Sequence, residues 1–202
     1  MTERRLRRDA VRNRMAVLAA ADALFNRRES SEDLTMADIA AAAGVGKATV
    51  FRAFGDRTGL IRALYEARLE PTIDAVEAGP PPWGPTTPPL QRIPALLDAL
   101  LCFKLDNRRL ALALEETSGA GPYRAENYDR WHLLLQVMLD QIPGMVHSDF
   151  TAHVLLAATR ADLVEHLAGQ ERVSPERMRT QLADFTARVL STHPKTTERR
   201  PG

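Results

Sequence analysis

Apolar residues recur at helical spacing in several stretches of this chain. In the first stretch, Met15, Leu18, Ala21, Leu24 and Phe25 form one apolar stripe. Residues three or four positions apart share a face of an α-helix, so this stripe predicts an amphipathic helix. No segment shows the alternation and the hairpin turns that strands require. The pattern therefore predicts an all-α fold.

The chain beyond residue 70 is divided by a segment rich in proline. Residues 79–89, GPPPWGPTTPP, cannot form a regular helix, because proline lacks a backbone donor and fixes φ. A helix is expected to end before this segment, in the middle to late seventies. Farther on, Ser148 is a candidate helix cap, and Pro175 suits the first position of the last helix. The expected helices after the segment are 90–106, 108–117, 123–141, 149–168 and 175–191.

Two short helices joined by a glycine turn are predicted at residues 35–54, TMADIAAAAGVGKATVFRAF. Thr35 is a good N-cap, and Asp38 three residues later completes an approximate capping box. Gly44 suits a sharp turn, because it has no Cβ. The expected inward positions are Met36, Ile39, Ala40, Val45, Val50 and Phe54.

A helix, a short turn containing glycine and a second helix are typical of the helix-turn-helix motif. The second helix of that motif lies in the major groove of DNA. Here Lys47, Thr49 and Arg52 face outward on the second helix. Two helices around a glycine also occur in bundles that never contact nucleic acid, so this spacing alone leaves both interpretations open.

The segments on either side of the motif extend the pattern. AVLAAADALF precedes it, and GDRTGLIRALY follows it, with Asp56 as an expected N-cap. The blocks ADALF and LTMADIAAAAGVGKATVFRAFGDRTGLIRALY closely resemble the N-terminal domain of the TetR family of bacterial transcriptional regulators. The resemblance covers roughly residues 10–70, and beyond it the chain is similar to the family only in helical layout and length. The apolar face expected after Asp56 consists of Leu60, Ile61, Leu64 and Leu69.

The resemblance implies which residues contact DNA. Thr35 would hold a phosphate with its hydroxyl and the helix N-terminus, and Arg57 would touch another at the start of the next helix. Phe51 stands where the family usually has tyrosine, and the loss of a hydroxyl–phosphate bond costs on the order of 1 kcal/mol. The implied DNA-binding residues are Thr35, Gly46, Lys47, Ala48, Thr49, Phe51, Arg52 and Arg57.

Charge is distributed unevenly, although the whole chain has a formal net charge of only +1. Residues 1–70 hold 13 Lys and Arg against 10 Asp and Glu, so this part carries +3 and the remainder −2. A basic N-terminal arm can follow a phosphate backbone or enter a minor groove, and it can also be a solubilising tail. Most of the excess lies in Arg4, Arg5, Arg7, Arg8, Arg12 and Arg14.

The last two long helices offer faces for a second copy of the chain. In the TetR family such helices usually pair with their copies in a four-helix bundle, although a monomeric core could use the same faces. We expect a homodimer, because a two-fold protein reads the two half-sites of a pseudo-palindromic operator. The candidate interface residues are Phe150, Val154, Ala157, Ala158, Ala161, Leu182, Phe185 and Val189.

Aromatic and apolar residues of the middle helices could line an effector cavity with a few orienting polar groups. A stripe of this kind is more often plain core, but the family context favours a cavity for a small apolar or amphipathic effector. The candidate pocket residues are Trp83, Leu97, Leu101, Phe103, Asn107, Tyr123, Tyr128, Trp131, Leu135 and Met138.

Other functional classes find little support in the sequence. His132, His147, His153 and His166 include no i, i+4 pair, so no metal site or cofactor is expected. Ser148 and Asp149 lie beside His147 in the sequence, but adjacency in sequence is not the geometry of a catalytic triad, so an enzyme is disfavoured. GVGKAT lacks the preceding strand and the first glycine of a phosphate-binding loop. No run approaches the roughly 18 apolar residues of a membrane span. Asp22 breaks the early apolar run, which disfavours a signal peptide.

These observations predict a cytoplasmic, dimeric DNA-binding regulator, and a single cysteine fits that compartment. The expected organisation is a basic arm at 1–9, a helix-turn-helix domain at 10–72, a helical regulatory and dimerisation domain at 73–192 and a polar tail at 193–202. We expect a repressor that a small-molecule effector releases from its operator. The alternative is a DNA-binding adaptor that responds to a protein partner and has no small-molecule ligand.

Overall fold

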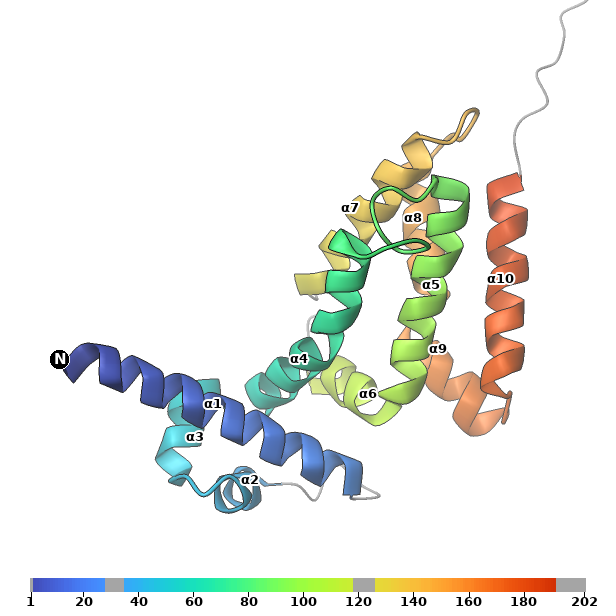
Figure 1. Ribbon diagram of the computed structural model, residues 1–202. Helices are drawn as coiled ribbons and strands as arrows, with labels where there is room; N and C mark the ends of the chain where they lie inside the picture. Colours follow the sequence, from blue (N-terminus) through green and yellow to red (C-terminus); the bar gives the residue numbers. More distant parts are fainter. Residues whose placement is uncertain (1, 28–34, 118–125, 192–202) are drawn as a thin grey trace, which may run out of the picture. The chain divides into compact units, whose positions relative to one another are not determined.

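The computed structural model describes residues 2–27, 35–117 and 126–191, which contain helices and no strand (Figure 1). The predicted all-α fold is therefore confirmed. Two compact units are distinguished by their internal contacts: the first comprises Met1–Glu70 and Arg109–Gly119, and the second Pro71–Arg108 and Ala120–Gly202. Among the helices described, none is long and apolar enough to cross a membrane.

The first unit is built around three helices that contact one another. α1 packs against α2 and α3, and α2 packs against α3. The unit contains α1 (Thr2–Arg27), α2 (Met36–Ala42), α3 (Lys47–Phe54), the first part of α4 (Arg57–Ala78) and most of α6 (Arg108–Thr117). Its most deeply buried side chains, each at most 1% exposed, include Ala21, Ile39, Val50, Leu60 and Ile61.

α1 differs from its prediction in two respects. Met15 is 67% exposed, whereas Val17 is 1% exposed and faces the core together with Ala21. The inward face is thus turned away from Met15, which the apolar stripe had included. The helix also begins at Thr2, so the residues expected to form a separate arm are its first turns. Arginine is a good helix former, and an ion pair between Asp9 and Arg12 at 3.3 Å supports these turns.

The second unit consists of helices that pack in pairs. α7 packs against α8, α5 packs against α10, and α5 also contacts α7 and α9. The unit contains the end of α4, α5 (Pro89–Asp106), α7 (Glu126–Asp140), α8 (Ser148–Ala157), α9 (Ala161–Glu165), the π-helical turn η2 (His166–Gln170) and α10 (Pro175–Ser191). Its fully buried core includes Ile93, Leu96, Leu97, Leu135, Leu139 and Leu155.

Most predicted helix limits in this unit agree with the structure. The helices expected at 90–106, 108–117 and 175–191 are observed at 89–106, 108–117 and 175–191. The helix expected at 123–141 is observed at 126–140, and residues 123–125 lie outside the described part of the chain. Ser148 is not the cap of α8: His147 occupies the N-cap position in a left-handed conformation, and the Ser148 hydroxyl donates to the Asp140 carboxylate.

The helix predicted at 149–168 is broken. α8 ends at Ala157, and Arg160 is extended, with φ −64° and ψ 146°. The buried Thr159 hydroxyl donates to the Leu156 carbonyl at 3.0 Å, and the Arg160 guanidinium donates to Asp162 at 2.9 Å. Side-chain bonds of this kind compete with the regular helix bonds and allow the chain to bend.

Arg92 ties the proline-rich segment to the helices on either side of it. Its guanidinium donates to the Val76 carbonyl at 2.8 Å, near the end of α4, and to the Trp83 carbonyl at 2.7 Å. Arg92 is buried, and this burial lowers the pKa of its guanidinium. Both bonds are charge-assisted and shielded from water, so we expect them to fix the segment in place.

Candidate nucleic-acid interface

α2 begins with the capping box that its sequence predicts. The Thr35 hydroxyl accepts a hydrogen bond from the backbone N–H of Asp38 at 3.2 Å. The Asp38 carboxylate in turn accepts one from the backbone N–H of Thr35 at 3.1 Å. The Thr35 hydroxyl also donates to this carboxylate, at 2.9 Å. A phosphate bound at this helix end would therefore compete with Asp38 for the Thr35 donors.

Glycine makes the turn between α2 and α3 possible. Gly44 has a φ of +65°, which residues with a Cβ rarely adopt. The backbone N–H groups of Gly44 and Val45 bond to the carbonyls of Ala41 and Ala40, which ends α2. Gly46 occupies the N-cap of α3, so this helix begins without a side-chain cap. Its first turn is accessible to an external acceptor such as a phosphate.

One side of α3 is exposed while the other packs in the core. Val50 is 0% and Phe54 9% exposed, as predicted, whereas Val45 is only half-buried. Phe51 is 41% exposed, and the Lys47 ammonium lies 5.7 Å from the centre of its ring in a cation–π contact. The other predicted DNA-binding residues are exposed (Thr35, Gly46, Ala48, Arg52) or half-buried (Thr49, Arg57).

Arg14 of α1 supports the C-terminal end of α3. Its guanidinium donates to the Ala53 carbonyl at 3.1 Å and lies 4.6 Å from the centre of the Phe54 ring. A cation at a helix C-terminus compensates the carbonyls that have no partner within the helix. The charge count alone assigns Arg14 to the basic arm. Its spacing from the buried Val17 and Ala21 is the signal that places it on the side of α1 that faces α3, where its side chain is still exposed.

Asp56 and Gly59 form the corner between α3 and α4. The Asp56 carboxylate accepts a hydrogen bond from the backbone N–H of Gly59 at 2.8 Å, which confirms the predicted N-cap. Gly59 lies so close to α3 that an added Cβ would be 2.0 Å from the Phe54 carbonyl oxygen. Only glycine therefore fits here without a shift of the backbone. Arg57, the first residue of α4, lies between Asp56 and Gly59 in this corner.

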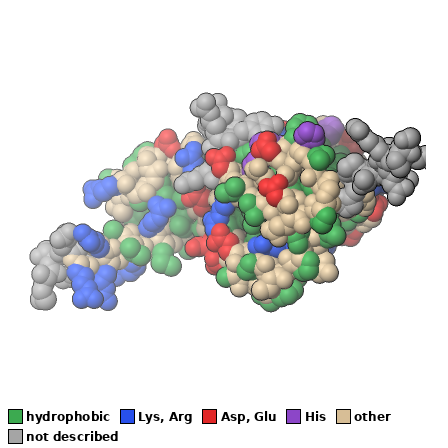
Figure 2. Space-filling view, turned by 90° about the horizontal axis from the view of Figure 1, so that it is seen from above, with side chains coloured by type: hydrophobic (Ala, Val, Ile, Leu, Met, Phe, Trp, Pro, Cys, Tyr) green, Lys and Arg blue, Asp and Glu red, His purple; other side chains and the backbone are tan. Residues whose placement is uncertain are grey.

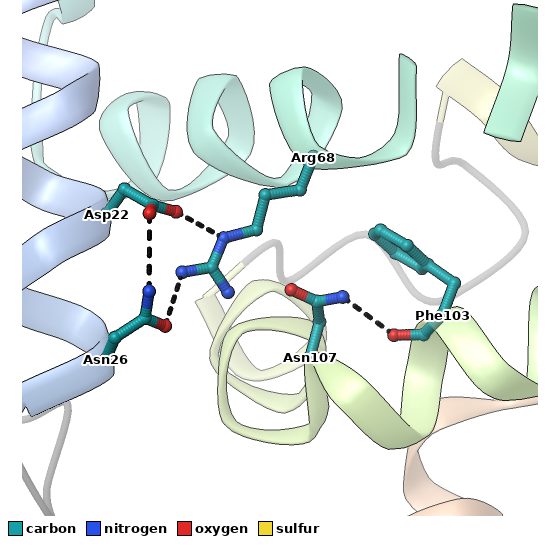
Figure 3. Close-up of polar contacts among 5 residues, drawn as sticks. All are labelled: Asp22, Asn26, Arg68, Phe103 and Asn107. Carbon is teal, nitrogen blue, oxygen red and sulfur yellow. Dashed lines mark hydrogen bonds and ion pairs between the residues drawn. The ribbon is translucent and has the colours of Figure 1, made fainter. Parts of the chain in front are cut away.

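A polar network joins α1 to α4 within the first unit (Figure 3). Arg68 donates to the Asp22 carboxylate at 2.6 Å and to the Asn26 amide oxygen at 2.8 Å. The Asn26 amide group also donates to Asp22, at 3.3 Å. The Arg68 side chain is 19% exposed, so its bonds are better shielded than those of an ordinary surface pair. The polar Asp22 that interrupts the apolar run of α1 thus serves as a partner of Arg68.

Positive charge gathers near the beginning of the chain. Figure 2 shows Lys and Arg side chains, in blue, clustered at the N-terminal end of α1. Arg4, Arg7, Arg8 and Arg12 are exposed on this helix. An exposed basic helix can contact phosphates, although it presents its charges with helical spacing instead of along an extended arm.

Most predicted pocket residues belong to the core of the second unit. Trp83 is 37% exposed, Tyr128 is half-buried, and Tyr123 lies outside the described residues. The Asn107 amide donates to the Phe103 carbonyl, one turn back along the chain, at 2.9 Å (Figure 3). The others are at most 7% exposed: Leu97, Leu101, Phe103, Trp131, Leu135 and Met138.

A groove of about 480 Å³ lies between α5 and α10. Its lining is mixed, with the charged Asp98 and Arg179 joined by hydrogen bonds of 2.7 Å beside the apolar Pro94. At its wall, the buried Thr186 hydroxyl has no hydrogen-bond partner within the described part of the chain. None of the predicted pocket residues that the structure describes lines this groove.

The predicted dimer residues divide into an outer and an inner group. Phe150 is 68% and Phe185 37% exposed, so both rings are available for contact with a second copy. Ala161 and Leu182 are 4% and 8% exposed, because they pack in the core of their own protomer. The remaining candidates, Val154, Ala157, Ala158 and Val189, are half-buried. Pairing through these faces stays a prediction.

The N-terminal unit matches a described protein family. Residues 17–64 match the family "Bacterial regulatory proteins, tetR family". This range covers the second half of α1, the α2–α3 motif and the start of α4. It therefore contains the exposed face of α3 and the corner that supports it.

Two named relatives are transcriptional regulators. The HTH-type transcriptional repressor LfrR of Mycolicibacterium smegmatis is 38% identical over 82 residues, which is 41% of this chain and 42% of that protein. The HTH-type transcriptional regulator SAR0097 of Staphylococcus aureus is 22% identical over 188 residues, covering 91% of this chain and 96% of that protein. The chain thus aligns with less than half of the first relative and with nearly all of the second.

The fold extends this similarity beyond the matched N-terminal range. A TetR-like transcriptional regulator from Rhodococcus sp. RHA1 has a TM-score of 0.61 and 20% identity, covering 89% of this chain and 96% of that one. At this identity the likeness shows a shared fold. The family and the named relatives are transcriptional regulators and not enzymes, as predicted. Residues 17–64 of this chain therefore form a helix-turn-helix domain of the tetR family of bacterial regulatory proteins, within a fold that it shares with a TetR-like transcriptional regulator.

Proposed function

We propose that this regulator is a sequence-specific repressor that binds its operator through the exposed face of α3. The observation that carries the proposal is a solvent-facing pair of cations, Lys47 and Arg52, on a helix whose opposite face is buried. A lysine or arginine that reaches guanine is the commonest specific base contact. Arg14 and Gly59 support the C-terminal end of this helix, and such support keeps the base-reading side chains in register.

The direction of regulation is proposed from a relative. LfrR, which is 38% identical over 82 residues, is named a transcriptional repressor. We propose that this chain likewise represses, and that it does so as a homodimer on a pseudo-palindromic operator. The exposed Phe150 and Phe185 of α8 and α10 support pairing of two copies. Half-sites would then lie about 34–36 Å apart or at a multiple of that distance.

Release from DNA is proposed to follow effector binding in the second unit. A small apolar or amphipathic molecule would need to bind the DNA-free conformation more tightly than the DNA-bound one. The groove between α5 and α10, with its apolar wall and a few polar groups, supports this part of the proposal.

A second candidate function is favoured by the packing of the second unit. Six of the residues expected to line a cavity are at most 7% exposed and lie in the core: Leu97, Leu101, Phe103, Trp131, Leu135 and Met138. This packing favours a DNA-binding adaptor that responds to a protein partner. A small hydrophobic molecule that weakens operator binding by the purified chain would argue against the adaptor.

The first test separates specific DNA contacts from general charge. The double variant Lys47→Ala/Arg52→Ala removes two cations from the exposed face of α3. If each cation contributes about 1–3 kcal/mol to the free energy of operator binding, the affinity of the double variant should fall by at least 30-fold. Its melting temperature should change little. A matched control, Arg172→Ala/Arg177→Ala, removes the same charge from exposed positions of the second unit and should bind normally. Wild-type affinity in the first variant would refute the assignment of α3.

The second test identifies the operator. Genomic fragments selected by the purified chain at two salt concentrations should share one inverted repeat that persists at the higher concentration. Hydrogen bonds to bases depend little on salt concentration, whereas phosphate contacts weaken steeply as the salt concentration rises. Binding that is salt-sensitive and shows no shared sequence would leave only a generic basic surface and would contradict a sequence-reading dimer.

A further inference from the structure

We propose that α7 and α8 together form a binding site for a divalent transition-metal ion such as Zn²⁺. The site consists of His132 on α7 and of Asp149 and His153 on α8. One ligand atom from each of the three residues lies within 4.8 Å of the others. Because the proposal concerns metal binding by the second unit, it is independent of the operator and of the proposed effector.

The three side chains have the chemistry of a transition-metal site. Two imidazoles and one carboxylate, with a remaining position for water, are a common ligand set for Zn²⁺ and for related first-row divalent ions. Mg²⁺ and Ca²⁺ prefer sites made of oxygen atoms alone, so the two histidines select against them. The residue types therefore indicate the class of ion.

The distances fit a small ion. The Nε2 atom of His132 lies 3.4 Å from the Oδ1 atom of Asp149. Two ligand atoms about 3.3–3.4 Å apart can both reach a tetrahedral ion at about 2.0–2.1 Å, the usual zinc–ligand distance. This pair is therefore already at the required separation, and a bound ion would replace the contact that His132 Nε2 makes with the Asp149 backbone carbonyl at 3.2 Å. All three ligand atoms lie within 4.8 Å of one another, so to complete the site the His153 imidazole has to turn out of its stack on His132 and direct its lone pair at the ion.

The surroundings orient the imidazoles. The Tyr128 hydroxyl lies 2.6 Å from the Nδ1 atom of His153. When Nδ1 donates its proton to the Tyr128 oxygen, Nε2 carries the lone pair that a metal needs. A hydrogen bond to the other ring nitrogen is the usual partner of a metal-bound histidine. The rings of His132 and His153 also stack, with centres 3.9 Å apart, and Tyr128 stacks beside them at 5.8–6.2 Å.

The site is closed towards the helices and open towards water. The His132 side chain is 14% exposed, whereas that of Asp149 is 67% exposed. An ion could enter at the carboxylate and then meet the more buried imidazole. Bound there, it would link α7 to α8 and stabilise the second unit.

Metal binding is tested with the full chain, free of any histidine tag and stripped of metal. Calorimetric titration with Zn²⁺ should give one bound ion per chain, and Co²⁺ should give the strong visible absorption of a tetrahedral complex. Zn²⁺ should also raise the melting temperature, because it binds the folded chain. Mg²⁺ at the same concentration should neither bind saturably nor raise the melting temperature. Equal binding of Mg²⁺, or no saturable binding of Zn²⁺, would overturn the proposal.

Variants localise the ion. His153→Gln and Asp149→Asn should abolish the Co²⁺ absorption and the thermal shift, and Tyr128→Phe should weaken Zn²⁺ binding about 10- to 100-fold. Asp149 is exposed, so Asp149→Asn keeps the fold, and its melting without metal checks this. His166→Gln is the matched control, because His166 has a carboxylate neighbour, Glu171 at 3.0 Å, but lies outside the cluster. Unchanged Zn²⁺ affinity in His153→Gln and Asp149→Asn, or its loss in His166→Gln, would refute this site.

Discussion

Replacing Gly59 with alanine tests whether the corner between α3 and α4 holds the recognition helix. In an ordinary helix, replacing glycine with alanine stabilises by roughly 0.5–1 kcal/mol. Here the new Cβ would lie 2.0 Å from the Phe54 carbonyl oxygen, which is 1.0 Å inside the 3.0 Å limit that real Cβ contacts essentially never cross. The usual gain should therefore be reversed.

The magnitude follows from the shift that the backbone must make. Forcing extra atoms into a packed site costs typically about 1–3 kcal/mol, and the gain in helix propensity offsets less than about 1 kcal/mol. We expect a net loss of about 1–2 kcal/mol, equivalent to about 2–8 °C in melting temperature for a chain of this length. Because Phe54 belongs to the last turn of α3, operator affinity should decrease too.

Thermal unfolding of Gly59→Ala and of a control, Gly46→Ala, measures the effect. At Gly46 the added Cβ would meet only the Thr49 hydroxyl oxygen, at 3.8 Å, which is an ordinary contact. The control should therefore lose less stability than Gly59→Ala, although its position at the N-cap of α3 makes it informative for DNA binding as well. A Gly59→Ala protein that melts at or above the wild-type temperature would refute the close approach of α4 to α3.

Substitutions at three further positions test individual contacts. Arg14→Met should lower stability by about 1 kcal/mol and weaken operator binding without changing its salt dependence, because Arg14 acts on α3; a flatter salt slope in anisotropy titrations would instead indicate a phosphate contact. Arg92→Met leaves two backbone carbonyls without a donor, so urea unfolding should show a loss of about 2 kcal/mol, and Arg92→Lys should lose less. The hydrogen bond from Arg160 lowers the pKa of Asp162 below its ordinary value of 3.8, so its contribution is present above that value and is lost as the pH falls through the lower, folded-state pKa. The difference in unfolding free energy between wild type and Asp162→Asn should therefore shrink on acidification, and a constant difference would contradict the ion pair.

The helix-turn-helix motif was predictable because its determinants are local. Thr35, Asp38 and Gly44 act on residues within a few positions of themselves, and the structure confirms the roles predicted for all three in the fold. The orientation of α1 was less predictable, because apolar residues there lie on two neighbouring faces. Periodicity favoured Met15, whereas packing against α2 and α3 buries Val17 instead.

In the second unit, local sequence signals predicted where helices begin but did not predict the break after α8. Proline and serine mark the starts of α5 and α10, and both helices agree with prediction to within one residue. The break after α8 has no such marker, because it depends on the side-chain bonds of Thr159 and Arg160 and not on glycine or proline. The cavity was equally hard to predict from local signals. A stripe of large apolar residues has the same sequence pattern whether it lines a pocket or fills a core.

Several side-chain contacts of this chain join residues that are far apart in sequence. Residue spacing within one helix cannot predict such contacts. Arg14 reaches a residue 39 positions away, and Arg68 reaches one 46 positions away. The histidines illustrate the same limit. No i, i+4 pair exists, and so no metal site was expected, yet His132 and His153 meet because two helices reverse at a turn with positive φ at Gly144 (82°) and His147 (57°). The register set by this turn decides which imidazoles become neighbours, so the search for ligand sets in helical regulators has to consider facing helices as well as single ones.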